Sequence, residues 1–100
     1  MSGPTKSFIA KLTVKPERRG DLIALQTELK RLVAEQEPDA LVYEFMQSAD
    51  DPDVFMCVAT FRDADAFEHH MHIDFHDRLV PPIFETLAKD MEIGFYESLA

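Results

Sequence analysis

The chain of 100 residues contains no tryptophan, no asparagine, only three glycines and a single cysteine. That cysteine, Cys57, lies inside an apolar run and has no partner for an internal disulfide, so a reducing, cytoplasmic setting is expected. With 46% hydrophobic and 29% charged residues, the composition is that of a globular protein and excludes a disordered chain. The length matches one domain, and we predict a single domain over residues 1–100.

Basic residues are also scarce. The chain has 10 lysines and arginines against 19 acidic residues, for a net charge of −9. Nucleic acid is therefore not expected as a partner, because phosphate binding needs a basic surface. No apolar run approaches the roughly 20 residues of a membrane span. The first seven residues lack the apolar stretch of a secretory signal, so no membrane partner is expected either.

Alternating hydrophobicity and turn residues divide the chain into strands and helices. Four strands are predicted, over residues 7–14, 41–47, 54–62 and 91–96. The turn-forming sequence Asp50-Asp51-Pro52-Asp53 joins the middle two strands as an antiparallel hairpin.

Two helical regions lie between the strands. The first begins near Pro16 and should end near Gln36, because Pro38 disfavours helical geometry in the residue before it. The apolar spacing predicts that its buried face contains Leu22, Leu25, Leu29, Leu32, Val33 and Gln36. The second region has Asp63 as its expected N-cap, and a second piece begins near Asp74. Pro81 and Pro82 should kink or restart that helix.

The resulting order is β-α-β-β-α-β, which predicts an α+β protein of the ferredoxin-like type. In this fold a four-stranded antiparallel sheet carries helices on one face. The other face would contain an apolar set large enough to mark an interface, so we expect a homodimer through this open face. The set is Ile9, Val42, Met46, Met56, Val58 and Tyr96.

Three stretches resemble a known family: residues 10–17 (AKLTVKPE), 37–44 (EPDALVYE) and 61–71 (FRDADAFEHHM). They are similar to the antibiotic biosynthesis monooxygenase domain of the dimeric α+β barrel superfamily, and the likeness extends from Phe8 to Tyr96. The resemblance implies a homodimer with a pocket between sheet and helices in each subunit. It also implies a cofactor-free oxygenase of quinols or aromatic polyketides, in which the substrate anion itself donates an electron to dioxygen.

The sequence departs from the family pattern at several positions. Phe61 occupies a place that is often tryptophan, and Asp39 stands where glycine is usual. Ile73-Asp74 replaces a step from a small residue to proline. Relatives that degrade haem rely on an Asn, a Trp and a His, so haem degradation is disfavoured here. The same absences weaken the likeness to oxygenases of the anthrone type.

Four histidines, His69, His70, His72 and His76, form the most conspicuous polar group. His70 and His76 match positions where the family often has histidine, and we predict them as catalytic residues. Imidazole titrates near neutrality and could accept a proton from a phenol or an enol. A metal site is a weaker hypothesis, since the spacing matches no zinc pattern. His69 and His72 are interpreted as solvated groups on the helix surface.

Substrate-binding residues are predicted from the aromatic set, as Tyr43, Phe61, Phe67 and Phe75. Tyr43 could donate a hydrogen bond to a substrate oxygen or could simply belong to the core. The preferred function is a cofactor-independent monooxygenase of a quinol-like or polyketide aromatic. Two alternatives remain: a non-catalytic dimeric module that binds a small hydrophobic ligand, and an isomerase or lyase of a small carbonyl compound.

Overall fold

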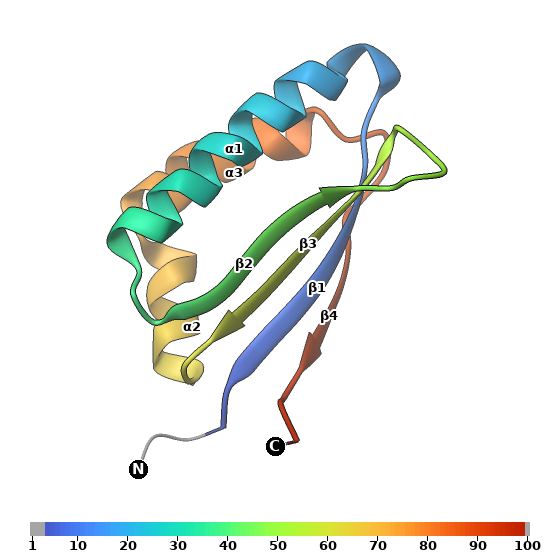
Figure 1. The fold of residues 1–100 in the computed structure, drawn as a ribbon. Coiled ribbons are helices and arrows are strands. Elements are labelled where there is room, and N and C mark those ends of the chain that lie inside the picture. Colours follow the sequence, from blue (N-terminus) through green and yellow to red (C-terminus); the bar gives the residue numbers. More distant parts are fainter. Residues whose placement is uncertain (1–3, 100) are drawn as a thin grey trace.

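A computed structural model describes residues 4–99 and has the predicted order of elements (Figure 1). The strands are β1 (Lys6–Thr13), β2 (Ala40–Gln47), β3 (Val54–Phe61) and β4 (Glu92–Tyr96). The helices are α1 (Arg19–Gln36), α2 (Ala64–His72) and α3 (Asp74–Glu85), and a 3-10 turn, η1 (Pro16–Arg18), precedes α1. The fold is therefore α+β and ferredoxin-like, as the sequence predicts.

The four strands form one antiparallel sheet in the order β2-β3-β1-β4. Figure 1 shows the helices gathered on one side of this sheet and the other side uncovered. In the β2–β3 hairpin the Ser48 hydroxyl accepts hydrogen bonds from the backbone N–H groups of Asp50 and Asp51, both at 3.2 Å. Side chains on β3 alternate regularly between buried and half-buried, so each strand contributes to both faces.

Helix α1 ends where expected, because Glu37 precedes Pro38 and adopts a non-helical conformation with φ −124° and ψ 78°. The predicted buried face is wrong at its last position, since Gln36 is exposed. Glu37 is buried instead, four residues beyond the buried Val33. The helix also buries Gln26, which lies between Leu22 and Leu29 on its apolar face.

The second helical region divides at Ile73, which is extended with φ −70° and ψ 146°. Asp63 caps α2 as predicted, and its side chain accepts a hydrogen bond of 2.8 Å from the N–H of Ala66. Of the two expectations for the prolines, a kink or a restart, the restart is wrong, because α3 runs through Pro81 and Pro82. Buried residues on both sides of the pair, Leu79 and Ile83, keep this segment packed on the core.

The two faces of the sheet differ in what covers them. Phe8, Ala10 and Leu12 point toward the helices and are buried. The opposite face is uncovered in the single chain, and Ile9, Val42, Met46 and Tyr96 are 38–55% exposed there. Within this open face Tyr96 lies over Gly94: a Cβ atom at Gly94 would be 2.8 Å from the Tyr96 hydroxyl oxygen. No helix between residues 4 and 99 is long and apolar enough to cross a membrane.

Candidate active site

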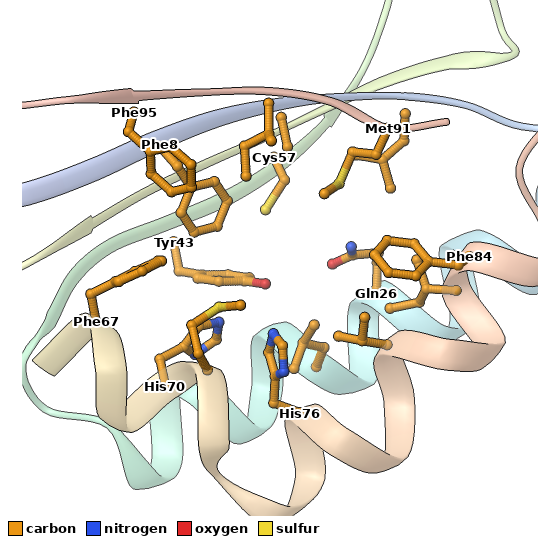
Figure 2. Close-up of a pocket in the computed structure, with 17 residues that line it drawn as sticks. Phe8, Gln26, Tyr43, Cys57, Phe67, His70, His76, Phe84, Met91 and Phe95 are labelled. Atoms are coloured by element: carbon orange, nitrogen blue, oxygen red, sulfur yellow. The ribbon is translucent and has the colours of Figure 1, made fainter. Parts of the chain in front are cut away.

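A cavity of about 180 Å³ lies between the sheet and the helices (Figure 2). The strands and the segment before β4 line it with Phe8, Ala10, Leu12, Met91, Ile93 and Phe95. The helices contribute Leu29, Phe67, Met71, Val80, Ile83 and Phe84. Five side chains in the wall can form hydrogen bonds: Gln26, Tyr43, Cys57, His70 and His76. The site is thus an apolar chamber with a few polar groups, which is the usual composition of a small-molecule site.

The strongest polar interaction at the cavity joins His70 on α2 to Glu37. His70 Nδ1 lies 2.9 Å from Glu37 Oε2, and the two side chains are only 2% and 3% exposed. When the Glu37 carboxylate is ionised it can only accept, so the Nδ1–H of His70 is then the donor. In that tautomer of a neutral imidazole, Nε2 can accept a proton. The arrangement is that of a general base oriented by a carboxylate.

Glu37 is held in place by the turn that follows α1. The backbone N–H of Ala40 donates to the Glu37 carbonyl at 3.0 Å, and the N–H of Arg62 donates to the Asp39 carbonyl at 2.8 Å. The Arg62 side chain also donates to Asp39 Oδ1 at 2.7 Å. Asp39, which departs from the usual family glycine, therefore has a local partner at the end of β3.

His76 joins His70 because the helix is broken between them. On a continuous helix residues six apart point in directions about 120° apart. The extended Ile73 changes this geometry, and the two ring centroids lie 4.7 Å from each other. Burial, and then the proximity of His70, lowers the pKa of His76 from 6.5 to about 4. His76 is therefore a neutral imidazole near pH 7.

Tyr43 and Cys57 provide neutral groups on the strand side of the cavity. The Tyr43 ring lies 5.8 Å from the His70 ring, centroid to centroid. Burial raises the pKa of Tyr43 well above its ordinary value of 10, and the neighbouring Cys57 adds to this shift. Burial likewise raises the pKa of the Cys57 thiol to about 11. Tyr43 thus stays a hydrogen-bond donor, and Cys57 stays an unreactive thiol.

The residues predicted from the sequence are distributed in two groups. His70, His76, Tyr43 and Phe67 meet at the cavity. Phe61 and Phe75 are buried in the core and do not line it. The Phe61 ring packs against His70, with centroids 4.9 Å apart, and so supports the imidazole from behind.

The other two histidines, His69 and His72, are exposed, as interpreted from the sequence. His72 Nε2 lies 3.4 Å from a Glu68 oxygen at the helix surface. Within residues 4–99, no three His, Cys, Asp or Glu side chains are grouped as a metal site would require. The histidines therefore separate into a pair at the cavity, with His70 buried and His76 half-buried, and an exposed pair outside it.

Sequence reasoning missed two residues of the site, Glu37 and Gln26. Gln26 had a visible signal, because it interrupts the apolar stripe between Leu22 and Leu29. Glu37 had none, since its partner is 33 positions away and the pair forms only when α1 and α2 pack. With Glu37 and Gln26 included, the site places a base, His70, where it can accept a proton from a hydroxyl group bound in an apolar cavity.

Comparison with known proteins identifies the family of this chain. The family model described as "Antibiotic biosynthesis monooxygenase" matches residues 7–80. The chain belongs to the antibiotic biosynthesis monooxygenase family. No curated protein matches the chain.

Several solved structures have the same fold as this chain over nearly its whole length. A protein from Caulobacter crescentus CB15 superposes with a TM-score of 0.92, at 22% identity, over 97% of this chain and 92% of its own. A conserved protein from Methanosarcina mazei Go1 gives 0.87 at 24% identity, over 93% and 91% of the two chains. A structure described as an antibiotic biosynthesis monooxygenase gives 0.86 at 26% identity, over 95% and 99%. The monooxygenase fold thus extends over nearly the whole chain.

Proposed function

We propose that this protein is a cofactor-independent monooxygenase of a small phenolic aromatic compound. The observation that supports it best is the buried His70–Glu37 pair at the wall of an apolar cavity. A base in such a place can ionise a phenol while the surrounding side chains exclude water. The substrate anion, and not a cofactor, is then the electron donor to dioxygen.

The first step is proton transfer. The phenol O–H bond breaks, and its proton moves to Nε2 of His70 while the electron pair stays on the phenolate oxygen. The Glu37 carboxylate stabilises the imidazolium formed, because it already accepts the Nδ1–H bond. The Tyr43 hydroxyl, which remains protonated, is the nearby donor for the phenolate oxygen.

The second step uses dioxygen alone as oxidant. The phenolate gives one electron to dioxygen, and the two radicals combine to form a carbon–oxygen bond at a ring carbon that carries hydrogen. The His70 imidazolium returns its proton to the outer oxygen of the peroxide. The O–O bond then breaks as the ring carbon loses its hydrogen as a proton, and the hydroxide and this proton leave as water. For naphthohydroquinone the balance is naphthohydroquinone plus dioxygen giving hydroxynaphthoquinone plus water. No external reductant is needed.

The cavity volume favours a small substrate. Pockets for drug-sized ligands usually measure roughly 300–1,000 Å³, and a cavity of about 150 Å³ holds benzene. The volume of about 180 Å³ therefore suits an aromatic of one or two rings. A quinol-like compound fits this limit better than a larger polyketide.

The test is oxygen incorporation from isotopically labelled dioxygen with naphthohydroquinone, and with anthrone as the larger compound. The expected product is hydroxynaphthoquinone carrying one labelled oxygen, whereas uncatalysed oxidation gives unlabelled naphthoquinone and hydrogen peroxide. Losing the general base should lower the rate by about 10²–10⁴-fold in His70→Gln. Glu37→Gln keeps the shape of the site and should also lower the rate, while His69→Gln, on the exposed face of the same helix, should not.

Two results would reject the proposal. One is a wild-type protein that gives no labelled product from any compound, and the other is a His70→Gln variant that works at the normal rate. Ligand-induced stabilisation without turnover would favour a non-catalytic binding module. Turnover of a carbonyl compound without dioxygen would favour an isomerase or lyase.

The active form in this proposal is a homodimer in the cytoplasm. Its support is the open face, where Ile9, Val42, Met46 and Tyr96 remain exposed in a single chain. A second copy of the same face would bury them while leaving the cavity on the helix side of each subunit. The single buried cysteine is compatible with a reducing compartment.

A further inference from the structure

The amide of Gln26 is a polar group of the cavity wall that the proton-transfer step does not use. Gln26 is 5% exposed, and among residues 4–99 its Oε1 atom has no hydrogen-bond partner. Figure 2 shows the amide reaching from α1 into the cavity and facing the Tyr43 hydroxyl from the other side. Burying an amide oxygen without a partner costs free energy, so a partner from the cavity contents is expected.

The fold itself does not require glutamine at this position. Gln26 lies on the buried face of α1 between Leu22 and Leu29, which are both buried apolar side chains. Leucine has a similar size and a higher tendency to be buried, and it would complete the apolar stripe. The amide is therefore better explained by binding than by packing.

We propose that Gln26 determines specificity by holding a second hydroxyl group of the substrate, which makes the preferred ligand a dihydroxylated aromatic of one or two rings. The assignment of the first hydroxyl to His70 depends on the function proposed above. A hydroxyl is a suitable partner because it both donates and accepts. It can thus satisfy the amide whichever of its two ends faces the ligand.

The arrangement of the wall distinguishes the two hydroxyl positions. The His70 ring lies next to both the Tyr43 ring and the His76 ring, so the three form one polar cluster. Gln26 belongs to a different element, α1, and faces that cluster across the cavity (Figure 2). The lining between them is apolar and aromatic. A ligand with a hydroxyl at each end of a flat ring system would meet both polar regions at once.

The test compares the binding of two probes without dioxygen, so that nothing is oxidised. Naphthohydroquinone has two hydroxyl groups, and naphthol has one on the same ring system. The wild-type protein should bind naphthohydroquinone about tenfold more tightly, as expected for one additional hydrogen bond to a buried group. In Gln26→Leu this preference should disappear, and naphthol should bind as well as before or better.

The matched control is Gln36→Leu, an exposed glutamine on the same helix, which should keep the wild-type preference. Gln26→Met, which keeps the length of the side chain without its amide, replaces Gln26→Leu if that variant does not fold. If the variant still prefers naphthohydroquinone over naphthol as the wild type does, Gln26 does not hold the second hydroxyl, and the proposal is overturned. Equal weakening of both probes, or no binding of either to the wild type, would also overturn it.

The outcome is separate from the oxygen chemistry. If the preference depends on Gln26 but no labelled oxygen is incorporated, the specificity assignment stands and the monooxygenase proposal fails. If the wild type and Gln26→Leu both form labelled product, and neither distinguishes the two probes in binding, the monooxygenase proposal stands and the specificity assignment fails.

Discussion

The same four strands make both faces of the sheet, and both faces carry many apolar side chains. The two faces differ in the polar groups that lie beside them. Under the helices, Glu37 and His70 are buried and satisfy each other. On the open face, the Ser7 and Thr60 hydroxyls form a bond of 2.8 Å at a half-buried position beside exposed apolar side chains. The space under the helices can hold a buried acid because its partner comes from another helix, whereas the Ser7 and Thr60 hydroxyls of the open face pair with each other.

The largest effect should come from removing the acid on the covered face. Glu37→Ala leaves His70 buried without its partner, and breaking a buried pair of this kind costs about 3–5 kcal/mol of unfolding free energy. Urea denaturation measures the change. Glu35→Ala, which loses only an exposed pair with Arg31, is the control and should have little effect. Similar midpoints for both variants would contradict the importance of the buried pair.

A charge on the open face should act on assembly more than on folding. Val58 lies on β3 between Ile9 and Glu44 in the strand register, so Val58→Glu would place an unpaired acid within the expected interface. An unpaired charge of this kind costs about 2–5 kcal/mol, which raises the dimer Kd by roughly 30-fold or more. Light scattering over a concentration series checks this, and Ile23→Glu on the exposed side of α1 should leave the dimer intact. If the wild-type protein is a monomer at micromolar concentration, the open face is not a dimer interface.

The half-buried His76 should make the stability of the fold depend on pH. Because the pKa of His76 is about 4 in the folded protein and 6.5 ordinarily, the unfolded chain binds the proton first as the pH falls. His76 therefore destabilises the fold progressively between pH 6.5 and 4, by about 1–3 kcal/mol after allowance for its partial exposure. Melting curves of the wild type and His76→Phe isolate this part, since the carboxylates titrate in both. The exposed His72→Gln should follow the wild type.

The smallest effect is expected at the turn outside both faces. Arg62 and Asp39 form an ion pair of 2.7 Å whose side chains are more than half exposed. Arg62→Ala should cost about 0–1 kcal/mol of stability. If it also lowers turnover, the turn contributes to the position of Glu37, and a crystal structure of the variant would show Glu37 displaced.

The strands were predictable because alternation and short apolar runs are local properties of the sequence. Phe8, Ala10 and Leu12 have the period of a strand, and β3 is a short run that is apolar on both faces and follows turn residues. The helix boundaries at Asp63 and Pro38 were likewise local. The fold and the placement of the cavity on the helix side followed from these elements and from the family resemblance.

The chemistry of the site was less predictable because it depends on contacts between elements. The His70–Glu37 bond forms only when two helices pack, and the His70–His76 contact requires the break at Ile73. On a continuous helix the spacing would instead place His76 on the same face as the exposed His69 and His72. The continuity of α3 through its prolines also depends on packing, here by Leu79 and Ile83.

The Tyr96 ring lies over Gly94 on the open face. Because Gly94 has no Cβ atom, the ring can lie close to the backbone of the sheet. An alanine at this position would lift the ring, and since only the far end of a side chain has to move, a single subunit would tolerate it. Two sheets meeting face to face would be held farther apart. In a dimer of the proposed kind, Gly94 would therefore affect how closely the two sheets approach each other.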